Sequence, residues 1–265
     1  MTFLDEIEKV ARESYRVLRQ NGHCAILIGD MRKNKNVVPL GFWTIERYLS
    51  AGFILRELVI KRQHNCKTTG FWYNNSVKYN FLLLAHEYLA IFEKKKASKS
   101  SNKRAALAPP SLNPHTDAGQ PDVITILEST TVWIFNEKDW QSHVILNLTK
   151  RYSTGNYVLF CKDTGDRTKV DLIIDIKWDN MDELVRFAEE SLSTGGILAI
   201  ICEDVRKEDG SITPTALKIE QDLRNNKTLE IKELIVVSIE NDKQSKDNAN
   251  LEITHKYILI YRKCI

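Results

Sequence analysis

The chain contains the same sequence pattern twice, and this repeat constrains the fold more than any other feature. Each copy holds a charged helix, a glycine, an apolar run, an Asp-x-Arg-Lys stretch, a proline and finally His-x-Tyr. The first copy reads Ala11–Ser14, Gly22, Asp30–Lys33, Pro39, His86 and Tyr88, and the second reads Ala188–Ser191, Gly196, Asp204–Lys207, Pro214, His255 and Tyr257. Two copies are too few for a solenoid. The pattern therefore predicts two α/β half-domains.

Size and charge limit the classes of protein that the chain can be. A chain of 265 residues is one large domain or two small ones. The net charge is only +3, so a nucleic-acid surface would have to be a local patch. The five cysteines show no CxxC spacing, and no cluster of His, Cys and acidic residues has metal-ligand spacing. We expect neither a disulfide framework nor a metal site.

The apolar runs and the first residues bear on the compartment. The longest apolar stretches have the length of strands, so we expect no membrane-spanning helix. Residues 1–20 are charged with helical periodicity, which is not the pattern of a signal peptide. We therefore expect a cytoplasmic protein.

The first copy alternates helix and strand patterns. We expect a helix over 3–19, a strand over 23–28, a basic loop over 31–38 and a helix over 40–50. A strand over 53–61, a polar and aromatic loop over 63–78, and strands within 79–92 follow. Because residues 23–28 are almost continuously apolar, we expect that strand to be buried on both faces, as in a parallel sheet.

A linker separates the first copy from the rest of the chain. Residues 94–121 mix lysines with serine and proline, a composition that cannot bury a core. It is either a solubilising linker or a basic strap on a phosphate backbone. Further on, we expect strands over 130–135, 157–160 and 170–176, with a helix over 142–152. The predicted domains are thus 1–93, the linker 94–121, and 122–265.

With these elements placed, the first copy resembles the carboxy-terminal half of the S-adenosyl-L-methionine (SAM)-dependent DNA amino-methyltransferases. The resemblance covers residues 4–94 almost continuously, through Val10–Leu18, Ile26–Arg32, Pro39–Gly41, Gly52–Leu55, Gln63–Lys67, Gly70–Trp72, Tyr79–Leu83 and Ala85–Tyr88. A looser match covers residues 122–263 and includes Thr131–Trp133, Leu146–Leu148 and Tyr157–Leu159. The resemblance implies a Rossmann-like, three-layer αβα fold in two repeated half-domains, SAM as cofactor, DNA as partner, and a role in restriction–modification.

The chemistry of this family requires two loops that the chain lacks. The family holds the target amine with an acidic or amide residue followed by Pro-Pro and an aromatic residue, and it holds SAM with a glycine-rich loop. In the second copy, Asp175 and Trp178 stand where the acid and the aromatic residue would stand, without the prolines. They are the catalytic candidates by resemblance, and a strand end with a core tryptophan is the alternative. Only Gly165 follows the strand at Leu159, too few glycines for a close-approach turn.

The loop over 63–78 and the basic residues around it are the candidates for DNA contact. Cations pair with phosphates, and aromatic rings stack on bases. The candidates are Arg32, Lys33, Lys61, Arg62, His64, Asn65, Lys67, Trp72 and Lys78, with Arg206 and Lys207 at the matching place of the second copy. For the repeated His86 and His255 we expect a structural hydrogen bond rather than catalysis.

Three functions fit these observations. The chain can serve SAM-dependent methylation of an exocyclic base amine, with a second polypeptide supplying the missing loops. It can be a degenerate methyltransferase that binds DNA without chemistry. It can also be a gene remnant that folds and does little.

Overall fold

The computed structural model describes residues 2–63, 69–95, 127–160, 169–176, 180–240 and 251–264. The first repeat spans residues 3–93 and comprises α1 (Phe3–Val17), β1 (His23–Gly29), β2 (Met31–Lys33), β3 (Asn36–Val38), α2 (Leu40–Ser50), β4 (Ile54–Arg62), α3 (Thr69–Tyr79) and β5 (His86–Glu93). The predicted candidates His64, Asn65, Lys67 and Trp178, and most of the predicted linker, lie outside the described residues.

The rest of the chain forms a middle unit and the second repeat. The middle unit, residues 132–175, holds β6 (Val132–Asn136), α4 (Trp140–Tyr152), β7 (Tyr157–Leu159) and β8 (Val170–Asp175). The second repeat, residues 181–263, holds α5 (Met181–Ser191), β9 (Leu192–Cys202), β10 (Val205–Arg206), β11 (Ile212–Thr213), α6 (Thr215–Leu223), β12 (Leu229–Glu240) and β13 (His255–Lys263).

The two repeats share one strand order. In the first repeat, β1, β5 and β4 form an antiparallel sheet in the order β1-β5-β4, and in the second repeat β9, β13 and β12 pair in the matching order. The ladder register shifts at the same place, between Leu55 and Glu57 in β4 and between Ile231 and Glu233 in β12. The predicted α/β fold class with repeated half-domains is confirmed.

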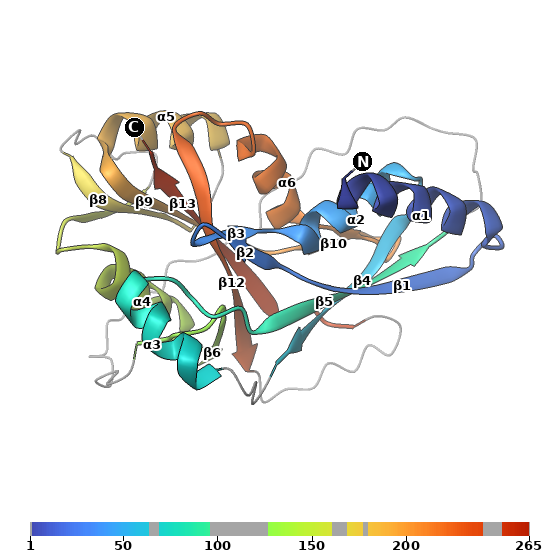
Figure 1. Ribbon diagram of the computed structural model, residues 1–265, viewed down its shortest axis with the longest axis horizontal. Helices are drawn as coiled ribbons and strands as arrows, with labels where there is room; N and C mark the ends of the chain where they lie inside the picture. The colour runs from blue at the N-terminus through green and yellow to red at the C-terminus, as the bar shows by residue number, and fades with distance from the viewer. Residues whose placement is uncertain are drawn as a thin grey trace.

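The middle unit widens the second repeat into a six-stranded sheet. Strand β6 adds in parallel beside β12, and β8 and β7 add in parallel beside β9, giving the order β6-β12-β13-β9-β8-β7. Figure 1 shows α5 and α6 on one side of this sheet and α4 on the other. The second half of the chain thus has three layers, α/β/α.

Each repeat begins with a helix whose ends are satisfied in the same way. The Thr2 and Asn180 side chains cap α1 and α5 by accepting hydrogen bonds from backbone amides. At the other end of each helix, a lysine at the end of the last strand of the repeat or directly after it donates to main-chain carbonyls. Lys94 Nζ lies 2.6 Å from Tyr15 O, and Lys263 Nζ lies 2.9 Å from Leu192 O. Each lysine therefore supplies donors to carbonyls that the helix leaves unpaired.

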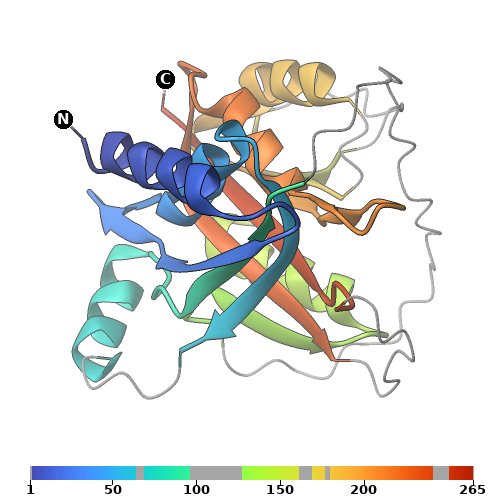
Figure 2. The same cartoon turned by 90° about the vertical axis from the view of Figure 1, so that its right-hand side faces the viewer.

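Two apolar clusters stabilise the molecule. One lies between the two repeats and joins α1 and α2 to α5, α6 and the inner face of the six-stranded sheet. The other lies on the outer face of that sheet, where α4 packs Trp140, Val144 and Leu148 against strand residues such as Ile201 and Ile260. Figure 2, a view at right angles to the first, shows α1 and α2 on the side of their strands that faces the second repeat. Both faces of the six-stranded sheet are therefore buried.

The prediction that residues 23–28 form a strand buried on both faces is wrong. In the described part of the chain, β1 pairs only with β5, and its burial alternates along the strand. Leu27 is 48% exposed. A short apolar run has no periodicity that distinguishes an edge strand from a central one.

Two segments predicted as loops contain regular structure. Residues 31–38 form the β2–β3 hairpin, whose turn residues Asn34 and Lys35 both have positive φ, as a two-residue hairpin turn requires. Most of the predicted loop 63–78 belongs to α3, which ends before Asn80 with φ +47°. Helix α3 escaped prediction because it exposes Trp72, Tyr73 and Tyr79, so its sequence lacks the usual apolar stripe. None of the described helices has the length and apolar composition needed to cross a bilayer.

Candidate functional site

Two reciprocal ion pairs connect the repeats. Arg32 of the first repeat pairs with Glu233 of the second at 2.6 Å, and Arg206 of the second pairs with Glu57 of the first, also at 2.6 Å. The side chain of Glu233 is fully buried, whereas that of Glu57 is 17% exposed. Burial raises the pKa of Glu233, and the Arg32 guanidinium opposes that rise. The repeats thus contact each other as the subunits of a two-fold dimer do.

Each ion pair also holds the segment that leads into the last strand of a repeat. Arg32 donates to Leu82 O at 2.7 Å, and Arg206 donates to Leu251 O at 2.8 Å. The amides of the same two leucines donate to Glu233 and Glu57, at 3.1 and 3.4 Å. Residues 82–85 and 251–254 are therefore equivalent lead-in segments.

A buried Asp–Tyr–His cluster lies at the same place in each repeat. Asp30 Oδ1 accepts from Gly41 N at 2.9 Å and Oδ2 accepts from the Tyr88 hydroxyl at 3.1 Å, which in turn lies 2.8 Å from His86 Nε2. In the second repeat, Asp204 Oδ1 accepts from Thr215 N at 2.8 Å, and His255 Nε2 lies 3.0 Å from the Tyr257 hydroxyl. The predicted structural hydrogen bond of the repeated histidine is confirmed.

Burial controls the protonation of both clusters. It raises the pKa of Asp30 to about 7, against hydrogen bonds from Gly41 and Tyr88, and the Glu220 carboxylate adds to the rise. It likewise raises the pKa of Asp204 to about 7. Burial lowers the pKa of His86 and of His255 to about 4. Asp204 Oδ2 has no hydrogen-bond partner among the described residues, so the second cluster is less completely satisfied than the first.

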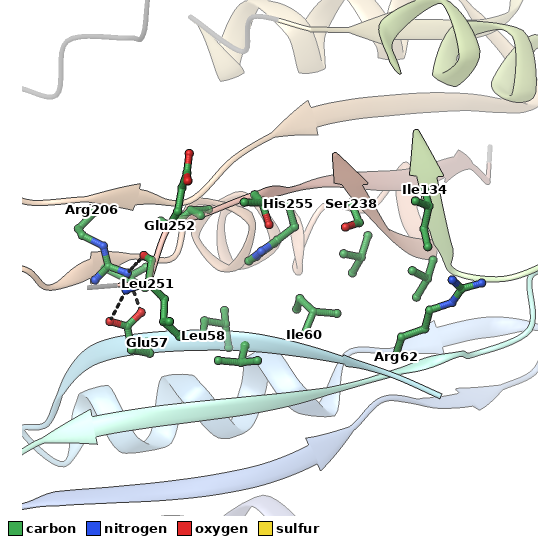
Figure 3. Close-up of a pocket in the computed structure, with 16 residues that line it drawn as sticks. Glu57, Leu58, Ile60, Arg62, Ile134, Arg206, Ser238, Leu251, Glu252 and His255 are labelled. Atoms are coloured by element: carbon green, nitrogen blue, oxygen red, sulfur yellow. Dashed lines mark hydrogen bonds and ion pairs between the residues drawn. The ribbon is translucent and has the colours of Figure 1, made fainter. Parts of the chain in front are cut away.

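A cavity of about 300 Å³ opens between β4 and the second repeat. Figure 3 shows its apolar walls, which include Leu58, Ile60 and Ile134, with Arg62 and Arg206 at opposite ends and His255 across the cavity from β4. The lead-in segment 251–254 lines the same cavity. The volume is at the lower end of the range for ligand sites, about 300–1,000 Å³.

The predicted catalytic position lies at the carboxyl ends of β7 and β8. Asp175 is the last residue of β8 and is 2% exposed, and Trp178 lies outside the described residues. Phe160, directly after β7, packs its ring on Phe187 of α5 with ring centroids 5.2 Å apart. No glycine adjoins these strand ends in the described residues, although a nucleoside cofactor needs a close backbone approach there. The described residues at this edge do not fit SAM.

Helix α3 and the β2–β3 hairpin bring several of the predicted DNA-contacting residues to one surface. Trp72, Tyr73 and Tyr79 are exposed by 48%, 44% and 44%. The Lys35 and Lys78 ammonium groups lie 4.8 and 5.1 Å from the centre of the Tyr79 ring, within cation–π range. We call the side chains Lys35, Trp72, Tyr73, Lys78 and Tyr79 the α3 surface. Lys33 is exposed on the same hairpin. Residues 63–86 and 31–45 contain no Asp or Glu, so Lys35 and Lys78 have no acidic residue within four positions in the sequence.

The other predicted candidates are engaged elsewhere or lie apart. Arg32 is committed to Glu233, and Lys61 pairs with Glu87 at 2.6 Å. Arg62 is exposed and lines the cavity of Figure 3. Lys35 belongs to the basic loop that the sequence offers for phosphate contact, and the hairpin places it over the Tyr79 ring. Sequence reasoning did not single out Glu233 as a partner of Arg32, because the two residues lie 201 positions apart.

Comparison with known proteins gives partial structural likenesses. No family model matches the chain, and no curated protein resembles it significantly. Among solved structures, TTHA0409 of Thermus thermophilus, assigned as a DNA modification methylase and complexed with SAM, is 23% identical over 38% of this chain and 40% of that chain, with a TM-score of 0.29. An M1.HpyAVI–SAM complex is 14% identical over 50% and 55%, with a TM-score of 0.28. NodS, an N-methyltransferase of Bradyrhizobium japonicum WM9 complexed with S-adenosyl-L-homocysteine, is 15% identical over 38% and 50%, with a TM-score of 0.23.

These matches span about half or less of the length of the similar proteins. Their TM-scores all lie below 0.5, so the assignment of a function to this chain depends on its own residues.

Proposed function

We propose that this chain is a DNA-binding protein of the amino-methyltransferase class that contacts DNA through the α3 surface. The exposed Trp72, Tyr73 and Tyr79 rings, beside lysines that have no acidic neighbours in sequence, carry this proposal. Rings of this kind stack on bases, whereas lysines attract the phosphate backbone. The predicted candidates His64, Asn65 and Lys67 lie next to α3 in the sequence.

The test measures binding of the full chain to labelled duplex and single-stranded DNA over a range of salt concentrations. We expect Trp72→Ala to weaken binding by about 5- to 100-fold, the effect of losing one base stack. Lys78→Ala should weaken binding and lower the salt slope by about one. Arg16→Ala is the control, because Arg16 is an exposed cation of α1 that pairs with Glu13. Unchanged affinity in Trp72→Ala, or tighter binding to matched RNA, would contradict the proposal.

Methyl transfer is the second candidate function, and the position of Asp175 favours it. Ligands of open α/β sheets bind at the carboxyl ends of strands, and Asp175 stands at such an end beside the parallel strand β7. By resemblance, Asp175 and Trp178 would hold the target amine, and SAM would supply the methyl group. Because the described residues do not fit SAM, we propose that a second polypeptide supplies the cofactor loop.

The amount of SAM bound by the full chain in equilibrium dialysis tests this second candidate. We expect no saturable binding by the chain alone. Saturable binding that Asp175→Asn abolishes would show a complete cofactor site and remove the need for a partner.

A further inference from the structure

In the first repeat, a short extended segment, Ser129–Thr131, fills the space beside the lead-in segment 82–85. Ser129–Thr131, just before β6, runs parallel to the lead-in of the first repeat: Leu83 N donates to Ser129 O at 2.9 Å, and Thr131 N donates to Leu83 O at 2.8 Å. The Thr131 hydroxyl accepts from Ala85 N at 3.1 Å and lies 2.9 Å from His86 Nδ1. Thr131 is completely buried, so this segment closes the site beside His86.

The same segment then continues as a strand of the second repeat. Thr131 O accepts from Val236 N at 2.8 Å, and β6 runs parallel to β12 with Val132 opposite Val236 and Ile134 opposite Ser238. Residues 129–134 thus bind the first repeat through its lead-in segment and the second repeat through β12.

The repeat identifies the equivalent groups on the other side of the molecule. Ala85 O accepts from Gln63 N at 2.8 Å, and Thr254 O accepts from Ile239 N at 3.0 Å. By this correspondence His255 matches His86, and Glu252 matches Leu83. Ile60 matches Val236, because each lies opposite the tyrosine of a His-x-Tyr motif, Tyr88 or Tyr257.

These equivalent groups line the cavity of Figure 3. Ile60, Glu252, Thr254 and His255 all belong to its wall. In the described part of the chain, no strand pairs with the free edge of β4, and no hydrogen bond reaches His255 Nδ1. The cavity therefore lies at the place in the second repeat that is equivalent to the place filled by Ser129–Thr131 in the first. The polar groups that line the two places are also equivalent.

We propose that this cavity binds an extended peptide segment that carries a serine or threonine. The segment adds in parallel to the free edge of β4 at Ile60–Arg62, and its hydroxyl accepts from Thr254 N and bonds to His255 Nδ1. The next residues are apolar and pack on Leu58, Ile60 and Ile134. Main-chain pairing supplies the affinity of such strand addition, and the side chains supply the selectivity. This inference goes beyond the proposed DNA binding and does not depend on it.

Arg62 adds a charge preference to the site. It occupies the place of Ser238, which lies opposite Ile134 in the filled site. A bound segment with an acidic residue three positions after the hydroxyl residue would therefore face the Arg62 guanidinium. Opposite charges directly across two strands are favourable, and like charges are unfavourable.

The probe is a fluorescent peptide with the sequence of residues 128–136, titrated with the full chain. We expect saturable binding that weakens by about 2- to 10-fold when valine replaces the threonine equivalent to Thr131, the effect of one hydrogen bond. Glutamate at the position of Ile134 should bind more tightly than lysine there, and Arg62→Ala should remove that difference. A peptide of the same composition in scrambled order is the control.

Two outcomes would overturn the inference. One is no saturable binding up to about 1 mM, or equal binding of the threonine, valine and scrambled peptides. The other is binding that His255→Asn leaves unchanged, because a peptide that exchanges into the filled site beside His86 does not touch His255. Since the peptide variants leave the protein unaltered, a folding defect of His255→Asn would not hide the result.

Discussion

The two repeats have the same strand order and the same polar contacts, but they differ in how much of their sheet is covered. The outer face of the second repeat packs against α4, so Ile201, Ile258 and Ile260 are all at most 3% exposed. The equivalent face of the first repeat carries Leu27 at 48% exposure. Strands β1 and β4 are edges in the described residues, whereas β9 and β12 each pair on both sides.

This difference shows which residues define a repeat and which respond to its surroundings. Asp30, Tyr88 and His86 recur as Asp204, Tyr257 and His255 because they hold strand ends together inside each repeat. The outer-face residues differ in burial because the middle unit covers only one of the two sheets. Paired substitutions at equivalent positions can separate the two kinds of residue.

The largest difference is expected at the reciprocal ion pairs. Glu233→Ala removes the fully buried carboxylate that accepts from Arg32 and from the Leu82 amide, and removing one member of a buried pair costs about 3–5 kcal/mol. Glu57→Ala should cost less, about 1–2 kcal/mol, because Glu57 and Arg206 are partly exposed. Chemical denaturation of both variants measures the difference. Equal losses would mean that the two interfaces are energetically the same.

The outer faces should show the next largest difference. Ile201→Ala opens a cavity under α4 and should lower the free energy of unfolding by about 2–4 kcal/mol. Leu27→Ala removes an exposed side chain from the matching strand and should change it by less than about 1 kcal/mol. A loss in Leu27→Ala as large as that in Ile201→Ala would show that the face of the first repeat is covered in solution.

A smaller difference is expected where the helices α2 and α6 begin. A Cβ added to Gly41 would lie 2.2 Å from the Tyr88 ring, whereas Ala216 carries a Cβ near the equivalent position of α6. Gly41→Ala should destabilise by about 1–3 kcal/mol through overpacking. Ala216→Gly should cost about 1 kcal/mol through helix propensity. Thermal unfolding of both variants is the measurement, and a neutral Gly41→Ala would show that the Tyr88 ring moves freely.

The buried carboxyls predict a dependence of stability on pH. The pKa of Asp30 and of Asp204 is raised to about 7 in the folded protein, so their contribution is complete below pH 4 and is lost as the pH rises to 7. His86 and His255, with pKa values lowered to about 4, contribute in the opposite direction: their stability is present above pH 6.5 and is lost as the pH falls to 4.

Asparagine variants separate these opposing contributions. Asp204→Asn should stabilise the protein at pH 8 relative to pH 5, because it removes a carboxylate whose Oδ2 has no partner in the described residues. Asp30→Asn should gain about 1 kcal/mol less, since Asp30 Oδ2 accepts from Tyr88. Urea denaturation of each variant at both pH values gives the comparison. A greater gain in Asp30→Asn would contradict it.

The sequence predicted the parts of this fold that local chemistry encodes. The helix over 3–19, the strand over 170–176 and the repeated His-x-Tyr contact are recognisable because periodicity, apolar runs and recurring polar residues are local signals. The exposure of β1 was not predictable, since an apolar run is compatible with both an edge and a central strand. The role of Arg32 was not predictable either, because its position in a basic loop does not reveal that Arg32 pairs with the buried Glu233.

The candidate site shows the same limit. Trp72 and Lys78 were chosen for their chemistry, and the structure places them on one exposed surface with Lys35. The cavity beside His255 had no sequence signal. It exists because, in the described residues, no segment fills the place beside His255 that Ser129–Thr131 fill beside His86.

The reciprocal contact between Arg32–Glu233 and Arg206–Glu57 has a consequence for how this molecule can change. In a homodimer, one codon specifies both halves of a two-fold contact, so any substitution acts twice. Here four separate codons specify them, and the association of the halves does not depend on protein concentration. Each half can therefore accumulate substitutions independently of the other. This independence allows the site beside His86 to be filled by a segment of its own chain while the equivalent cavity beside His255 stays open to a ligand.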